Sequence, residues 1–368
     1  MGFSVIAKKI GNQLSASSIW LWRFAQALVW LIGFGILFCL WFFPSLGVLM
    51  FWNILIPVAP LLLVVATGVW RNVCPLATTN LLPRHLGLSK RKIMTAAQLG
   101  KWNLASVILL FLIVPLRHPI FNNNGHATAL LIFMMVIAGI SVGLIYEWKS
   151  AWCSGLCPIH PVEKMYGQNT LLTLPNAHCS QCMNCVIPCP DSTPNINPAA
   201  SSKTIYHKIS GNLMVGGLPG FIWGWFQVPD KTDGIHLNSI LQAYEWPLIG
   251  LSISLSLYLI ISKLINRNSE RLLISVFAAV AVSFYYWYRI PELFGFGPFE
   301  KDGLLIDLSH HLSAWVFTFI SIVFTIFFWY WLVIRKQNKK SWIIRPEFGK
   351  RISSVNPNPI AKQNLHAE

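Results

Sequence analysis

The sequence predicts an all-α polytopic membrane protein with about eight transmembrane helices and a short cysteine-rich loop on the cytoplasmic side. Hydrophobic residues make up 54% of the 368 residues and charged residues only 11%, a composition too apolar for an ordinary soluble domain. Six of the eight cysteines lie between residues 151 and 191. The net charge of +15 does not indicate nucleic-acid binding, because the basic residues lie between and after long apolar runs.

Seven apolar runs are long enough to cross about 30 Å of hydrocarbon. They lie near residues 19–43, 46–70, 102–117, 127–148, 244–264, 272–290 and 308–334. No small-residue cleavage site follows the first run, so we interpret it as a retained helix and not as a signal peptide.

The distribution of charge predicts an eighth crossing. Segment 71–101 carries six basic residues and no acidic residue, and the tail after Leu332 is also basic, so both are expected in the cytoplasm. Seven crossings would place them on opposite sides. Residues 211–229 are the candidate for the missing crossing, although their short, Gly-rich sequence also suits a re-entrant or interfacial segment. Eight crossings put both termini in the cytoplasm and the acidic loops 230–245 and 289–307 outside.

The cysteine-rich loop follows the fourth predicted span. It contains the run Cys179-x2-Cys182-x2-Cys185-x3-Cys189, followed by Pro190. Disulfides are disfavoured in the reducing cytoplasm, so clustered cysteines there indicate metal binding. A zinc site usually separates two Cys-x2-Cys pairs by a dozen or more residues, whereas this spacing is that of bacterial ferredoxins. The run therefore predicts a [4Fe–4S] cluster.

Further cysteines precede this run. Cys153-x3-Cys157-Pro158 repeats the end of the ferredoxin run, and by that analogy Cys157 completes the first cube while Cys153 and Cys189 belong to a second. Cys74, before Pro75 at the end of the second span, is either another ligand or a buried thiol in a turn. These assignments give seven thiolates for eight positions, and the candidates for the eighth are His160, His178 and Asp191. Cys39 lies inside the first span and is interpreted as a packing residue.

Two pairs of spans, each ending in a Cys-Pro element and followed by a ferredoxin run, resemble the membrane polyferredoxins of the NapH and NosR type. CcoG is a more distant relative of that family. The resemblance covers roughly residues 18–200 and implies helices that anchor iron–sulfur clusters, with electrons passing between quinol, the clusters and a partner protein. The first Cys-Pro element departs from the family pattern, since it has only Cys74 where paired cysteines are usual, and there is no second full ferredoxin run.

A second candidate site lies on the outer face, where five histidines are expected: His118, His126, His236, His310 and His311. Asp307, His310 and His311 are spaced i, i+3 and i+4, which places them on one side of a helix. Such side chains can bind copper or another divalent ion, ligate haem b, or accept the protons released by quinol oxidation. The alternative is that Asp307 or Ser309 caps the helix.

These observations predict four parts: a four-helix membrane domain (1–150), a ferredoxin-like segment (151–200), a C-terminal membrane domain (201–334) and a basic cytoplasmic tail (335–368). We expect a bacterial inner-membrane protein that holds one or two [4Fe–4S] clusters and relays electrons between the quinone pool and a partner redox enzyme, acting as a quinol dehydrogenase or electron-transfer subunit. The alternative is an assembly factor or accessory subunit for a membrane or periplasmic metalloenzyme. No nucleotide-binding or nucleophile-elbow motif is present.

Overall fold

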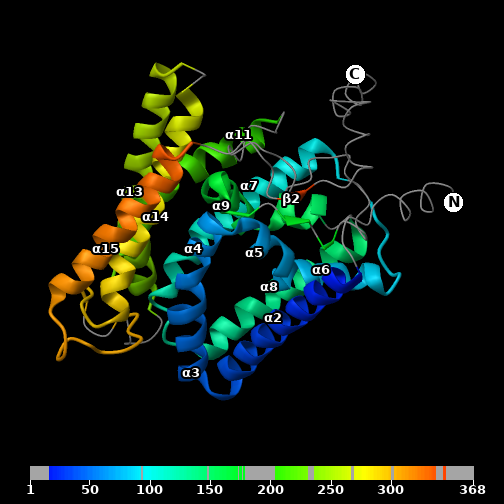
Figure 1. The fold of residues 1–368 in the computed structure, drawn as a ribbon, viewed down its shortest axis with the longest axis horizontal. Coiled ribbons are helices and arrows are strands. Elements are labelled where there is room, and N and C mark those ends of the chain that lie inside the picture. Colours follow the sequence, from blue (N-terminus) through cyan, green and yellow to red (C-terminus); the bar gives the residue numbers. More distant parts are fainter. Residues whose placement is uncertain are drawn as a thin grey trace.

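The computed structural model describes residues 16–92, 94–146, 149–172, 174–175, 177–178, 204–230, 236–266, 269–299, 302–336 and 343–344. Within these residues, seven helices are long and apolar enough to cross a membrane, in agreement with the seven predicted runs. The structure is therefore that of an all-α, multi-pass membrane protein (Figure 1). The predicted ferredoxin run at 179–189, with Asp191, lies outside the described residues.

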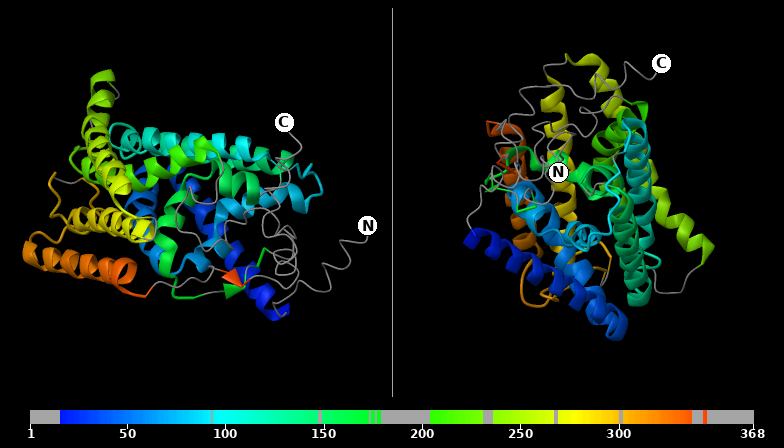
Figure 2. Two further views of the ribbon diagram at one scale, coloured as in Figure 1. Left: turned by 90° about the horizontal axis from the view of Figure 1, so that it is seen from above. Right: turned by 90° about the vertical axis from the view of Figure 1, so that its right-hand side faces the viewer.

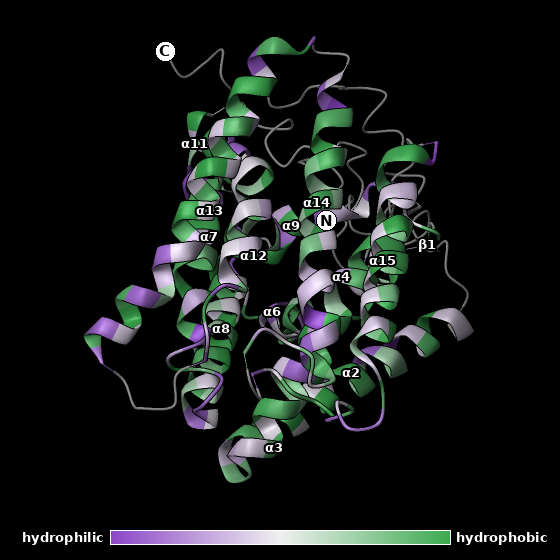
Figure 3. Cartoon of the chain, turned by 90° about the vertical axis from the view of Figure 1, so that its left-hand side faces the viewer, coloured by the Kyte–Doolittle hydropathy of each residue, from purple (hydrophilic) through white to green (hydrophobic). Residues whose placement is uncertain are grey.

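The seven helices are formed by the following elements: α2 (Ala16–Phe42); α3 (Pro44–Val48), η1 (Leu49–Leu55) and α4 (Ile56–Val65); α7 (Ala96–Ile113) with η2 (Pro115–Arg117); α8 (Gly125–Ile145); α13 (Leu237–Leu264); α14 (Glu270–Leu293); and α15 (Ala314–Trp329) with η7 (Tyr330–Ile334). Most of α2, α13 and α15 faces outward, with large apolar side chains exposed as lipid requires. Figure 3 shows these helices mostly in the hydrophobic colour.

Shorter elements cover one end of this bundle. They are α5 (Thr67–Val73), α6 (Pro75–His85), η3 (Lys149–Leu156), α9 (Ile159–Tyr166) and η4 (Gly167–Asn169). Strands β1 (Leu174–Pro175) and β2 (Ile343–Ile344) pair in parallel nearby. We call this the cysteine end of the molecule, because Cys74 and Cys157 lie there. The far end is where α7 and α12 (Leu218–Trp225) terminate.

The central packing joins the two halves of the sequence. The main core cluster combines residues of α4, α7, α9 and α12 with residues of α13, α14 and α15. Tyr286 of α14 illustrates this contact, since its hydroxyl donates to the carbonyl of Pro57 (2.6 Å) and accepts from the amide of Leu61 (3.0 Å). Figures 1 and 2 show α13, α14 and α15 grouped on one side of the molecule, while α2 and α8 lie on the other.

The segment proposed for the eighth crossing is a continuous helical run from 205 to 225, made of α11 (Ile205–Asn212), η5 (Leu213–Gly217) and α12. This run lies parallel to α7 along the length of that helix. Ser210 donates to Asn103 (2.5 Å) near the start, Phe221 contacts Phe111 with ring centroids 4.7 Å apart, and the indole of Trp225 donates to the carbonyl of Val114 (3.3 Å). It is not among the seven strongly apolar helices, because its glycines and the polar residues of α11 lower its mean hydropathy. The run begins at residue 205, six residues before the predicted start at 211, and ends at residue 225, four residues before the predicted end at 229.

Glycines permit the close crossing of α12 and α13. A Cβ atom added to Gly220 would collide with the carbonyl oxygen of Gly250, and one added to Gly250 would collide with the carbonyl oxygen of Gly220. Small residues at such crossings let helix backbones approach closely in membranes.

We therefore expect Gly220→Ala to force α12 and α13 apart and to lower the thermal midpoint of the detergent-solubilised protein strongly. Gly33→Ala in α2 is the matched control, because nothing lies within 4 Å of its added Cβ. That change should be neutral or slightly stabilising, since Ala is the better helix former. Equal midpoints for the two variants would contradict the crossing geometry.

Candidate metal centre

Both Cys-Pro elements lie at the start of a short helix, although their register differs by one residue. Cys74 is the N-cap of α6, and Pro75 occupies the first helical position. Cys157 precedes Pro158, which is the N-cap of α9. Proline suits the start of a helix because its fixed φ is already helical and its missing N–H has no partner to lose there. Each element thus holds a cysteine at a helix N-terminus at the cysteine end.

The structure brings three of the predicted ligands together. Cys153 and Cys157 are 3% and 9% exposed, and Cys74 packs against the core cluster that contains Cys153. The thiol of Cys157 interacts electrostatically with both Cys153 and Cys74. Cys39 is remote from this group, since its backbone faces Gly47 at the far end of α2.

The surroundings of these thiols act in opposite directions on their ionisation. Burial raises the pKa of Cys74, whereas the backbone amides of Ala77 and Leu76 at the start of α6 lower it. Burial also raises the pKa of Cys157 well above its ordinary value, and Glu163 and the two neighbouring thiols raise it further. The thiols are therefore protonated at neutral pH unless a metal supplies positive charge, because metal binding ionises cysteine.

A buried ion pair lies beside the cysteines. The carboxylate of Glu163 accepts from the guanidinium of Arg71 (2.8 Å), from the indole of Trp70 (2.8 Å) and from Nδ1 of His160 (3.3 Å). Glu163 and Lys164 are 2% and 6% exposed, and Glu163 forms an ion pair with the buried Arg71.

His160 keeps the properties of a candidate ligand. Burial lowers its pKa to about 4, so the imidazole is neutral at physiological pH. Its Nδ1 faces Glu163, and a carboxylate that orients one ring nitrogen leaves Nε2 as the nitrogen that binds metal in many proteins. Its amide also contacts the carbonyl of Cys157 (3.4 Å). The role of His160 as the eighth ligand remains a prediction.

Asn72, two residues before Cys74, holds the segment that leads into the ferredoxin run. Its side chain accepts from the amide of Ala177 (2.9 Å) and donates to the carbonyl of Pro175 (3.3 Å). Its carbonyl accepts from Nε2 of His178 (3.2 Å) and from the amide group of Gln26 (2.9 Å). His178 is 0% exposed and immediately precedes Cys179. The chain thus enters the ferredoxin run from a point fixed beside the helix that ends at Cys74.

The donor set suits an iron–sulfur centre chemically, since thiolates are the usual ligands of such clusters. Within the described ranges, no group of three or more His, Cys, Asp or Glu residues has a geometry that could hold a metal ion. Cys179, Cys182, Cys185 and Cys189, which the sequence assigns as ligands, lie outside those ranges. Cys74, Cys153 and Cys157 are thus the predicted cysteine ligands whose positions the structure describes.

The outer histidines are placed differently from the prediction. Residues 307–313 are not helical, and α15 begins only at Ala314 with Ser313 as its N-cap, so Asp307, His310 and His311 do not lie on one side of a helix, and neither Asp307 nor Ser309 is its N-cap. Asp307 accepts from the amide (3.0 Å) and hydroxyl (2.6 Å) of Ser309, a local turn that stops the helix from starting earlier. His310 and His311 are exposed, as are His126 and His236.

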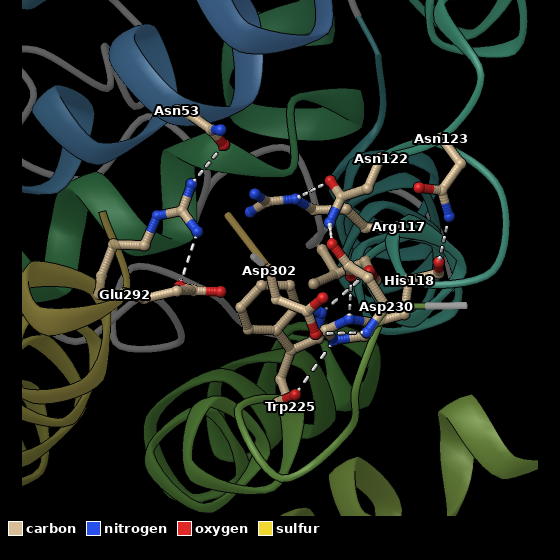
Figure 4. A network of polar contacts seen from close by, with 11 residues as sticks. Asn53, Arg117, His118, Asn122, Asn123, Trp225, Asp230, Glu292 and Asp302 are labelled. Carbon is tan, nitrogen blue, oxygen red and sulfur yellow. Dashed lines mark hydrogen bonds and ion pairs between the residues drawn. The ribbon is translucent and has the colours of Figure 1, made fainter. Parts of the chain in front are cut away.

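His118, in contrast, is 4% exposed and belongs to a polar network at the far end (Figure 4). Its Nδ1 contacts Asp230 (2.7 Å), its Nε2 contacts the carbonyl of Trp225 (3.1 Å), and its ring stacks on that indole with centroids 4.3 Å apart. Asn122 also donates to Asp230 (2.6 Å). Sequence reasoning placed His118 near the outer face but gave no partner for it, because Asp230 lies more than a hundred residues away.

Comparison with protein-family models, with curated proteins and with solved structures gives no match for this chain.

Proposed function

We propose that this protein is a membrane-embedded iron–sulfur electron-transfer protein that relays electrons between the quinone pool and a partner redox enzyme. The observation that carries the proposal is the meeting of Cys74, Cys153 and Cys157 beside the point where the chain enters the ferredoxin run. These three residues come from two distant segments, and packing alone does not require cysteine at each position.

The ligands in this proposal are the four cysteines of the ferredoxin run together with Cys153, Cys157 and Cys74, and the eighth position falls to His160, His178 or Asp191. The bound clusters would accept and donate single electrons. The protein residues fix and tune them: the backbone amides of Leu76 and Ala77 at the start of α6 contact Cys74, and the buried Arg71–Glu163 ion pair lies near Cys74 and Cys157.

Iron and acid-labile sulfide analysis of anaerobically purified protein tests this proposal. We expect about eight iron and eight sulfide per chain, or about four of each if only the ferredoxin run is occupied. A relay also predicts cluster reduction on addition of a quinol, followed by electron paramagnetic resonance. About one zinc without sulfide would contradict the iron–sulfur assignment. Clusters that no quinol reduces would favour the alternative role in assembly of a metalloenzyme.

We further propose that the helical run 205–225 crosses the membrane, giving eight crossings in the bacterial inner membrane with both termini and the cysteine end in the cytoplasm. The course of this run parallel to α7 supports the proposal, because α7 is itself long and apolar enough to cross. The basic residues of 71–101 support the orientation.

Reporter fusions test this topology. A reporter fused after Leu332 should be cytoplasmic, and one inserted at Asp233, which lies outside the described residues, should be periplasmic. If the Asp233 reporter is cytoplasmic, 205–225 does not cross.

A further inference from the structure

Two buried arginines lie close together at the far end of the bundle. Arg117, at the end of α7, is 4% exposed, and Arg289, on α14, is 0% exposed. Both contact Trp52: its ring lies against the Arg117 guanidinium (4.6 Å from the centroid), and its carbonyl accepts from Nη2 of Arg289 (2.8 Å). Two like charges in a buried position require compensation, because an unpaired buried charge is costly.

Arg289 has a carboxylate partner within ion-pair distance, whereas Arg117 has none among the described residues. Nη1 of Arg289 donates to Glu292 (2.7 Å), and Nη2 also donates to Asn53 (2.7 Å). The Arg117 guanidinium carbon lies 4.6 Å from the ring centroid of Trp52 and 4.9 Å from that of Trp225, and its Nε donates to Asn122 (2.6 Å). Within the part of the chain that the structure describes, no carboxylate lies within ion-pair distance of Arg117.

The acidic residue next to Arg117 in this network, Asp230, is already paired with His118. A backbone carbonyl can only accept, so Nε2 of His118 donates to Trp225, and the contact between Nδ1 and Asp230 needs a second proton. The pair is therefore either imidazolium with carboxylate or imidazole with carboxylic acid. In both forms it carries no net charge, which leaves Arg117 without a counter-charge from this pair.

Three buried donor groups of this network have no hydrogen-bond partner among the described residues. They are Nη2 of Arg117, Nε of Arg289 and the hydroxyl of Tyr285. Tyr285 and Arg289 are four residues apart and face the same side of α14. Tyr285 interacts electrostatically with both arginines. The indoles of Trp52 and Trp225 both contact the Arg117 guanidinium, and a carboxylate is the anion whose two oxygens best match the planar donors of a guanidinium. Figure 4 shows the outer nitrogens of Arg117 without a marked contact.

We propose that Arg117, Arg289 and Tyr285 form a buried binding site for a small planar carboxylate between α7 and α14. This site goes beyond the iron–sulfur function and does not depend on it, because it lies at the opposite end of the bundle from the cysteines. Its ligand supplies the direct carboxylate partner that Arg117 lacks and accepts from the three unpartnered donors.

Asp302 makes the affinity depend on pH. Burial raises its pKa to about 6, and it accepts from the amide of Asp230 (2.7 Å). The charged groups that face it are Asp230, Glu292, His118 and, through the close approach of Gly303, Arg289. With Asp302 ionised, the charges of the network sum to zero. Protonation of Asp302 below about pH 6 leaves one net positive charge, so a carboxylate should bind more tightly there.

The test is a titration of the purified full-length protein with sodium formate against sodium chloride at equal ionic strength, read by calorimetry and by the thermal midpoint. Formate should bind saturably and raise the midpoint, as any ligand of the native state does. Tyr285→Phe, which removes only an unpartnered hydroxyl, should weaken binding by about tenfold, and Arg117→Gln should abolish it. Iron content should not change in either variant.

Arg335→Gln is the matched control, since Arg335 also stacks on an indole (4.0 Å from the Trp331 centroid) and has an unpartnered nitrogen, but lies at the cysteine end. Its formate affinity should equal that of the wild type.

Formate binding to the wild type should become tighter as the pH falls from 7.5 to 5.5, and Asp302→Asn should remove that pH dependence. No saturable response to formate, equal binding in the Tyr285→Phe protein, or an affinity that does not change with pH would each overturn the proposal.

Discussion

Replacing Cys74 by alanine is expected to remove about four of about eight iron atoms per chain, because a four-iron cluster that lacks one thiolate is lost or degraded during purification. The expectation follows from the interaction of the Cys74 thiol with Cys157 and from its place at the start of α6. Iron and sulfide assays, with the electron paramagnetic resonance spectrum of the reduced protein, measure the effect.

Cys39→Ala is the control for this prediction. Cys39 is half-buried in α2 and lies at the far end, away from the other described cysteines, so its removal should leave iron content and spectrum unchanged. If Cys74→Ala also leaves both unchanged, Cys74 is a packing residue in a Cys-Pro turn. Cys182→Ala, in the centre of the ferredoxin run, should remove a cluster whichever role Cys74 has.

The membrane helices could be predicted from the sequence because length and apolar composition decide whether a segment can cross lipid. The second predicted span, 46–70, shows the limit of this reasoning. Its helix stops at Val65, and Ala66 leaves the helical conformation. The carbonyl of Val65 accepts instead from the amide of Leu171 (2.8 Å), a partner more than a hundred residues away that no local pattern indicates.

The central position of helix 205–225 could be predicted only in part. Its glycines lowered its apolar character and suggested a re-entrant segment, yet Gly220 and Gly224 are the positions where α13 approaches most closely. A buried helix in a membrane protein contacts other helices and not lipid, so small residues replace large apolar ones. Spacing of small residues at i and i+4 was the available signal.

The candidate metal centre could also be predicted only in part from the sequence. Spacing alone predicts the cysteine ligands, because the ligand geometry of a cluster constrains local sequence. The polar residues that support them were missed, since Arg71 and Glu163 are distant in sequence and charged residues near a membrane boundary usually face water. The Trp70-Arg71 pair, close before a Cys-Pro element, was the one local indication, because both side chains bind the same carboxylate.

Glu163→Gln is expected to destabilise the protein by about 3–5 kcal/mol, because it removes one partner of the buried Arg71–Glu163 ion pair. Arg71 and Glu163 are 6% and 2% exposed, so water cannot replace the lost interaction. Burial raises the pKa of Glu163, but Arg71 and the hydrogen bonds from His160 and Trp70 outweigh it and hold the pKa below its usual range. The free energy of unfolding in detergent, or the thermal midpoint, measures the loss.

The pH dependence of this effect has a definite sign. A carboxyl whose pKa is lowered by folding stabilises the native state above its unfolded pKa, about 4.3 for Glu, and this contribution disappears as the pH falls through the lowered folded value. The difference between wild type and Glu163→Gln should therefore be constant from pH 8 to about 6 and shrink below about pH 4. Glu245→Gln, at an exposed position of α13, should show no difference from the wild type at any pH.

The double variant Arg71→Met with Glu163→Leu should recover part of the stability that Glu163→Gln loses, since apolar residues of similar size remove both charges together. A double variant as unstable as Glu163→Gln would show that the loss comes from packing and not from the unpaired arginine.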